Sequence, residues 1–211
     1  MAGTLLLPPH PVAAFDVSQL QASLRKLGGN PKSLSDWQQM LQESKELPIA
    51  ARLKRVNEFF NRRIRFSSDQ EIWHQSDYWA TPMETLAKGA GDCEDFTIAK
   101  YFTLLNADVP VEQLRLIYVK ARIGGMNSNL QQAHMVLAYY ESPDAEPLVL
   151  DNLITDIRPA SRRMDLSPVF SFNSQGIFKG VDAKTKPETG GVTQLSRWSE
   201  LLQRARAEGF D

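Results

Sequence analysis

Apolar residues recur at intervals of three and four over the first third of the chain, which is the spacing of one face of an α-helix. This periodicity predicts three helices, within residues 16–29, 33–44 and 48–64. Asp16 is the expected N-cap of the first helix, and Gly28-Gly29 are its expected end. Ser33 or Ser35 is expected to cap the second helix. These faces carry Val17, Leu20, Leu24, Leu27, Trp37, Met40, Leu41, Ile49, Leu53, Val56, Phe59, Phe60 and Ile64. We expect the aromatic residues among them to lie in the core.

The middle of the chain predicts two more helices, separated by a glycine-rich turn. The first covers residues 81–89, with Thr81 as N-cap, Pro82 at the first helical position and Glu84 three residues after the cap. This is the arrangement of a capping box. The second is a largely apolar helix over residues 93–106, which we expect at the centre of the fold.

Beyond residue 110 the pattern changes to alternation and short apolar runs, which are typical of β-strands. The predicted strands lie within residues 114–123, 134–140 and 147–152, and a ragged hairpin is expected within 167–180. Helices followed by antiparallel strands indicate the α+β class. We expect a tail over residues 1–15 and one domain over 16–211. That domain comprises a helical lobe over about 16–106, a sheet lobe over about 112–190 and a C-terminal helix over about 193–208.

Composition and charge exclude several classes of function. Hydrophobic residues make up 42% of the 211 residues and charged residues 23%, as in ordinary globular proteins. The net charge of −1 gives no bulk attraction to nucleic acid or anionic lipid. No stretch approaches the ~18 apolar residues needed for direct membrane insertion. The run Leu5-Leu6-Leu7 is shorter than the ~7–15 residues of a signal-peptide core, so we expect either a cytoplasmic protein or a mature form without its leader.

Cys93 is the only cysteine of the chain and cannot form an internal disulfide. A lone cysteine is most often a small buried apolar residue. Cys93, however, follows Gly89-Ala90-Gly91, which we expect to be a flexible turn, and lies in the first turn of the predicted central helix. The partial positive charge and free N–H groups of a helix N-terminus stabilise a thiolate, so this placement favours a nucleophile.

A nucleophilic thiol needs a base, and the chain has three histidines. His10 lies in the proline-rich tail, and His74 is a second candidate. His134 opens an apolar strand, where a lone histidine is more often structural. Another strand ends at Asp151, whose carboxylate can orient an imidazole if the two strands pair antiparallel. We therefore expect Cys93, His134 and Asp151 to form a catalytic triad.

Three carboxylates, Asp92, Glu94 and Asp95, flank Cys93 and oppose its ionisation. One carboxylate ~6 Å from a thiolate costs about 2–3 kcal/mol at an effective dielectric constant near 20. Each acid could instead point to solvent or cap the helix. Three acids together suit a hard cation such as calcium, which takes about six to eight oxygen ligands. The sequence therefore suggests a metal site of Asp92, Glu94 and Asp95, although their spacing is not that of an EF-hand loop.

The oxyanion site is less defined by the sequence. The backbone N–H of Cys93 is a natural donor at the start of a helix. Trp79 is expected to line the cleft or to donate its indole N–H there, or else to be a core residue.

Four stretches of the chain together resemble a known family. They are Trp79-Ala80-Thr81-Pro82-Met83-Glu84, Gly89-Ala90-Gly91-Asp92-Cys93-Glu94-Asp95, His134-Met135-Val136-Leu137 and Leu148-Val149-Leu150-Asp151-Asn152. They resemble the core signature of the bacterial transglutaminase-like cysteine proteinases, and within that family the LapG type. The resemblance covers roughly residues 30–205, and the order of cysteine, histidine and aspartate matches the wider transglutaminase-like and papain-like superfamily.

The resemblance implies a transglutaminase-like fold and a calcium-dependent cysteine endopeptidase of the periplasm. Its substrate would be a large outer-membrane adhesin, cut in its N-terminal region near a pair of alanines so that the biofilm disperses. Its inhibitory partner would be an inner-membrane receptor for cyclic di-GMP, of the LapD type, which sequesters the protease. From the residues alone two alternatives stay open: an acyl transferase of the transglutaminase type, and a catalytically silent binding module on the same fold.

Overall fold

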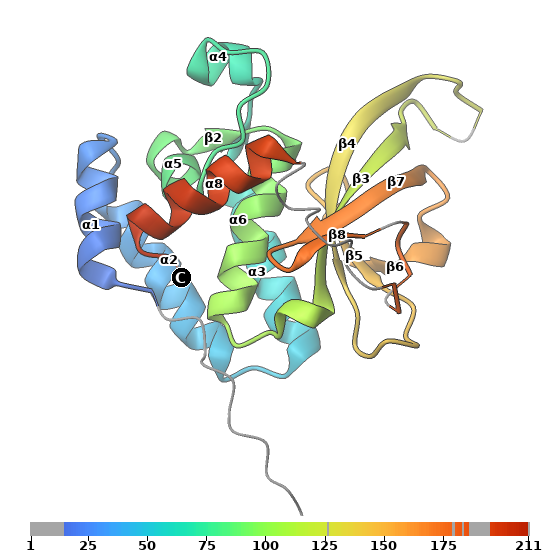
Figure 1. Ribbon diagram of the computed structural model, residues 1–211, viewed down its shortest axis with the longest axis horizontal. Coiled ribbons are helices and arrows are strands. Elements are labelled where there is room, and N and C mark those ends of the chain that lie inside the picture. Colours follow the sequence, from blue (N-terminus) through green and yellow to red (C-terminus); the bar gives the residue numbers. More distant parts are fainter. Residues whose placement is uncertain (1–14, 126, 179, 183, 186–194, 211) are drawn as a thin grey trace, which may run out of the picture.

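Helices form one half of the molecule and a twisted antiparallel sheet forms the other, with helix α6 between them (Figure 1). The computed structural model describes residues 15–125, 127–178, 180–182, 184–185 and 195–210. This arrangement confirms the α+β class. None of the helices in the described ranges combines the length and apolar character needed to cross a membrane.

Three helices begin the domain: α1 (Val17–Lys26), α2 (Pro31–Lys45) and α3 (Ile49–Arg63). Asp16 caps α1 as predicted, its carboxylate accepting hydrogen bonds from the backbone of Ser18 and Gln19. The predicted cap of α2 is wrong. The helix starts earlier, because Pro31 fits the first helical turn and the Asn30 side chain accepts the Lys32 N–H at 2.9 Å.

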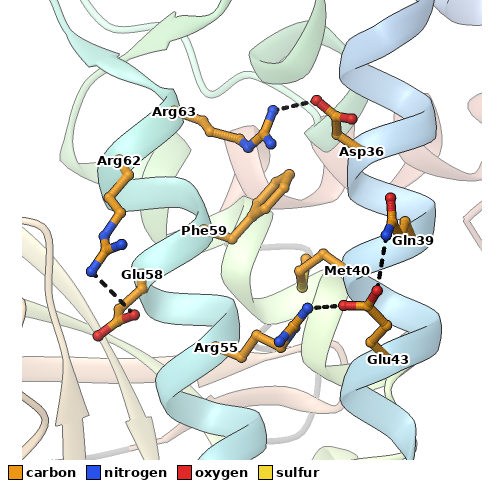
Figure 2. Close-up of a pocket in the computed structure, with 9 residues that line it drawn as sticks. All are labelled: Asp36, Gln39, Met40, Glu43, Arg55, Glu58, Phe59, Arg62 and Arg63. Atoms are coloured by element: carbon orange, nitrogen blue, oxygen red, sulfur yellow. Dashed lines mark hydrogen bonds and ion pairs between the residues drawn. The ribbon is translucent and has the colours of Figure 1, made fainter.

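Helices α2 and α3 pack side by side, and charged side chains line the groove along their seam (Figure 2). The ion pairs there are Arg63–Asp36, Arg55–Glu43 and Arg62–Glu58. Phe59 points into the groove, and the Arg63 guanidinium lies 4.9 Å from the centre of its ring. Neither cysteine nor histidine is among the described residues that line it, so the candidate chemistry lies elsewhere.

Helix α5 (Pro82–Lys88) begins with the predicted capping box. The Thr81 hydroxyl accepts the Glu84 N–H at 3.2 Å, and the Glu84 carboxylate accepts the Thr81 N–H at 2.8 Å. Gly89 ends the helix in the left-handed region, at φ 60°, where glycine is favoured. Thr81 is fully buried, so both bonds are shielded from water.

The segment after α5 is a strand rather than the predicted flexible turn. Ala90–Gly91 forms β2, which pairs in parallel with β1 (Arg65–Phe66). The short helix α4 (Asp69–Trp73) follows β1 and projects from the top of the view in Figure 1. The sequence does not predict β1 or α4, because each is too short to show a period. The pairing of β1 with β2 fixes the backbone directly before Cys93.

Helix α6 (Cys93–Asn106) is buried along most of its length, as its apolar composition predicts. One side of α6 packs on helix α3, and Trp37 of α2 donates its indole N–H to Thr103 of α6 at 2.9 Å. Its other side packs on the six-stranded sheet, whose order is β6-β5-β4-β3-β7-β8. The strands are β3 (Leu114–Arg122), β4 (Gln131–Tyr139), β5 (Leu148–Leu150), β6 (Arg158–Pro159), β7 (Leu166–Asn173) and β8 (Gly176–Phe178).

Helix α8 (Ser196–Glu208) crosses over α6 and closes the domain (Figure 1). The start predicted near residue 193 lies outside the described residues. Arg204 of this helix donates to the Trp79 carbonyl at 2.6 Å and to the Tyr78 hydroxyl at 2.8 Å, and it pairs with Glu84. The last helix thereby holds the segment that leads into α5.

We expect Thr81→Val to lower the free energy of unfolding by about 1–2 kcal/mol, because the isosteric methyl cannot accept the Glu84 N–H. Thr81→Ser keeps the hydroxyl and should retain most of that stability. Urea unfolding followed by circular dichroism measures both changes. Equal losses in the two variants would show that the hydroxyl contributes nothing to the cap.

Candidate active site

Cys93 is the first residue of α6, as the sequence predicts, and buried carboxylate contacts fix its position. The Asp95 carboxylate accepts the Asp92 N–H at 3.3 Å and the Ala80 N–H at 2.8 Å, and Asp95 is fully buried. A Cβ atom at Gly91 would lie 2.7 Å from the Asp95 Cβ, so only glycine fits there. These contacts set the direction in which the chain enters α6.

His134 and Asp151 form a buried pair on the sheet. Strands β4 and β5 are antiparallel, with Leu137 opposite Leu150, so His134 and Asp151 lie at the same end of the ladder. His134 Nε2 is 2.7 Å from Asp151 Oδ1, and the two residues are 4% and 1% exposed. With Nε2 occupied by the carboxylate, Nδ1 is the ring nitrogen left for proton exchange with a thiol.

Thr97 joins the cysteine helix to the histidine strand. Its hydroxyl lies 2.8 Å from the Cys93 carbonyl and 3.1 Å from the carbonyl of Met135, the residue after His134. Thr97 therefore links the start of α6 to the strand that carries the His134–Asp151 pair, and the catalytic triad of Cys93, His134 and Asp151 stays a prediction. His74, by contrast, is exposed at the end of α4, and His10 lies outside the described residues.

The thiol of Cys93 is held in its protonated form by its surroundings. Burial raises its pKa most, and the charge and hydrogen bond of Glu94 raise it further, with Asp92 adding to the effect. Glu94 Oε2 lies 2.7 Å from the sulfur. The Met135 backbone opposes this shift and lowers the pKa. Without a counter-charge on these acids, the thiolate is disfavoured.

Asp151 is in the opposite electrostatic state. Burial would raise its pKa, but His134, the Leu153 N–H and Arg163 lower it to about 2. Leu153 donates to Oδ1 at 3.0 Å, and Arg163 Nη2 donates to Oδ2 at 2.7 Å. Asp151 is therefore an anion under any condition in which His134 acts as a base. Sequence reasoning missed Arg163, because its spacing from Asp151 follows no helical or strand period.

The acids near Cys93 form two overlapping clusters instead of the single predicted set. Asp92 and Glu94 surround the sulfur, while Asp92 and Asp95 gather with Asp69 of α4. In each cluster, one carboxylate oxygen from each acid and, in the first, the sulfur of Cys93 all lie within 4.8 Å of one another. Asp69 was not predicted, since it is far from Cys93 in sequence and only the β1–β2 pairing brings it close.

The cluster of Asp69, Asp92 and Asp95 fits a hard cation. Asp69 is 6% exposed, and its Oδ1 has no hydrogen-bond partner among the described residues; the same holds for Asp92 Oδ1. Burial raises the pKa of Asp69 to about 6, and burial with the charge of Glu94 raises the pKa of Asp92 to about 7. Buried, unpaired carboxylate oxygens are the ligands that calcium takes.

Asp95 combines the two alternatives that the sequence left open. Its carboxylate receives two backbone N–H groups, so it organises the start of the helix, and it also faces Asp69 and Asp92. Glu94 borders the thiol and belongs to the other cluster. Trp79 is 6% exposed and stacks on Phe172 at 5.7 Å between ring centres, which favours the core alternative for this residue.

Comparison with known proteins identifies the family of this site. The family model for bacterial transglutaminase-like cysteine proteinases matches residues 33–164, while no curated protein matches the chain. The structure is similar to Legionella pneumophila LapG, at 36% identity over 92% of this chain and 99% of that one, with a TM-score of 0.75.

Two further LapG structures from Legionella pneumophila resemble the chain to the same degree. One was treated with EGTA and has a TM-score of 0.76 at 36% identity, covering 92% of this chain and 99% of that one. The other is calcium-bound and has a TM-score of 0.73 at 38% identity, covering 90% and 98%. The chain is a cysteine protease and belongs to the bacterial transglutaminase-like cysteine proteinases.

Proposed function

We propose that this protease is a calcium-dependent endopeptidase that cuts a large cell-surface adhesin in its N-terminal region, near a pair of alanines. Release of the adhesin would promote biofilm dispersal. The observation that carries the proposal is the buried His134–Asp151 pair, on a strand that Thr97 links to the helix of the single cysteine, in a chain 36% identical to Legionella pneumophila LapG over 92% of its length.

In the proposed mechanism, Cys93, His134 and Asp151 act as the catalytic triad. His134 Nδ1 takes the thiol proton as sulfur attacks the scissile carbonyl, and the Asp151 anion stabilises the resulting imidazolium. The imidazolium then protonates the leaving amine, and a thioester joins the substrate to Cys93. Water, deprotonated by His134, hydrolyses the thioester and restores the thiol. Because the family is one of proteinases, water is the expected acyl acceptor rather than an amine.

Calcium bound at the acids would neutralise the charges that hold the proton on Cys93. Asp69, Asp92 and Asp95 would hold it, with Glu94 next to the sulfur. The calcium-bound structure of Legionella pneumophila LapG and the unpaired oxygens of Asp69 and Asp92 support this assignment.

We further propose a periplasmic location and sequestration by an inner-membrane receptor of the LapD type that responds to cyclic di-GMP. Likeness to LapG supports both parts of this proposal. The net charge of −1 gives the chain no overall attraction to nucleic acid, so we propose no nucleic-acid partner.

Cys93→Ala should fold normally and lose all detectable cleavage, because a small side chain is removed together with the nucleophile. His134→Ala should be equally inactive. The test is incubation with the N-terminal region of a candidate adhesin, followed by mass analysis of the fragments. Cleavage by Cys93→Ala near the rate of the unmodified protein would overturn the assignment of the nucleophile.

Asp151→Asn should reduce kcat by about 10³–10⁴-fold, because the amide favours the wrong tautomer of His134. Its melting temperature should fall only slightly, because Arg163 keeps Asp165 as a partner when Asp151 loses its charge. Unchanged kinetics in this variant would mean that another residue orients His134.

Asp69→Asn should raise the calcium concentration needed for half-maximal thermal stabilisation by about 10–100-fold. The measurement is the melting temperature against free calcium, which needs no substrate. Asp156→Asn removes an exposed carboxylate and serves as the matched control. If Asp69→Asn titrates like the control, Asp69 is not a ligand.

Chelation should stop cleavage, calcium should restore it, and magnesium should not, because magnesium prefers a strict octahedron and keeps its waters. Asp92→Ala should also raise the calcium requirement. Full activity of the unmodified protein in excess chelator would leave the acids with a structural role only.

A further inference from the structure

We propose that Arg163 is a positioning residue for catalysis, which sets the orientation of His134 by holding Asp151 in one rotamer. This inference rests on the proposed triad and adds a fourth side chain that acts through it. The candidate appears in no sequence motif, and it emerges from the contacts of Asp151 alone.

The two oxygens of Asp151 have separate partners. Oδ1 contacts His134 Nε2 at 2.7 Å and the Leu153 N–H at 3.0 Å, whereas Oδ2 contacts Arg163 Nη2 at 2.7 Å. Rotation of the carboxylate about its terminal torsion, which is intrinsically soft, would break the Arg163 contact. Arg163 therefore determines where Oδ1 points, and with it the plane of the imidazole.

Arg163 is itself held by a two-point contact with Asp165. Its Nε lies 2.9 Å from Asp165 Oδ1, and its Nη2 lies 2.7 Å from Asp165 Oδ2. Two parallel bonds to a planar guanidinium fix its orientation, which a lysine could not reproduce. Arg163 is 2% exposed and Asp151 is 1% exposed, so their contact is shielded from bulk water, whereas Asp165 is partly exposed.

The backbone around Arg163 is anchored on both sides. It follows the 3-10 helix Ala160–Arg162, and its N–H donates to the Ala160 carbonyl at 2.9 Å. Its own carbonyl accepts the Leu166 N–H at 3.0 Å, where β7 begins. The guanidinium is thus carried by a tight turn between two strands of the sheet that also carries His134.

The charges also explain why Arg163 is paired with a second acid. A lone guanidinium beside Asp151 would stabilise the anion but would reduce its attraction for the imidazolium that forms during catalysis. Asp165 offsets that positive charge. Lys100 of α6 also interacts with the charge of Asp151. Burial lowers the pKa of Lys100 to about 7, and the charge of Asp151 opposes that shift.

The test compares Arg163→Met, Arg163→Lys and the control Arg162→Met in the full chain with calcium. Arg162 is exposed and adjacent, so its substitution makes the same chemical change without touching Asp151. Arg163→Met should lower kcat by about 10–100-fold with KM little changed. Arg163→Lys keeps the positive charge but cannot make the two-point contact with Asp165, so its kcat should lie between those of Arg163→Met and the unmodified protein.

A second readout needs no substrate. The ¹⁵N spectrum of the His134 ring should show a proton fixed on Nε2 in the unmodified protein and a mixture of tautomers in Arg163→Met. Assignment is practical because the chain has three histidines. Should Arg163→Met fail to fold, Arg163→Lys provides both readouts with the charge retained.

The proposal stands if kcat falls and the tautomer mixture appears in the Arg163 variants but not in Arg162→Met. It is overturned if Arg163→Met keeps its rate, or if activity falls while the His134 spectrum stays unchanged, which is a purely structural effect. If the unmodified protein cleaves no adhesin, the proposed function fails, whereas the ¹⁵N spectra still decide the role of Arg163.

Discussion

The carboxylate of Asp95 is the contact on which the candidate site depends most. It is fully buried and receives N–H groups from Ala80 and Asp92, which are separated in sequence by helix α5. It therefore joins the segment before α5 to the start of α6. The close approach requires glycine at position 91. These contacts set the direction in which the chain enters α6 at Cys93.

The buried carboxylate of Asp151 and the half-buried carboxylate of Asp92 have pKa values shifted in opposite directions, and their neighbours explain the difference. Asp151 meets an imidazole, a guanidinium and an N–H group, which together outweigh burial. Asp92 meets Glu94, so burial and like charge both favour its proton. A bound cation would offset the negative charge of these acids and favour their ionised form. Asp151 therefore stays charged next to His134, whereas the charge of Asp92 depends on whether a cation is bound.

Local signals in the sequence predicted the parts of the fold that depend on near neighbours. The Thr81 capping box, the start of α6 at Cys93 and the antiparallel placement of His134 and Asp151 are all encoded within a few residues or one strand pair. Asp69 and Arg163 could not be predicted in this way. Each reaches the site through pairing of distant segments, and neither has a periodic pattern around it.

The same limit explains smaller errors. Serine residues inside α2 resemble caps, but Asn30 and Pro31 together start the helix one turn earlier. Glycines before Cys93 suggest flexibility, yet Ala90–Gly91 pairs with β1. In the first case the residues just before the serines start the helix, and in the second a strand distant in sequence orders the glycine segment.

The contacts of Arg204 link the order in which the chain is synthesised to the time at which the protease can become active. Its guanidinium, near the end of the chain, holds the Trp79 carbonyl and the Tyr78 hydroxyl. The same stretch supplies the N–H groups that Asp69 and Asp95 accept. Chains emerge from the ribosome N-terminus first. The geometry around Cys93 is therefore completed only after the last helix has docked, so that a nascent chain carries its nucleophile in an unfinished site.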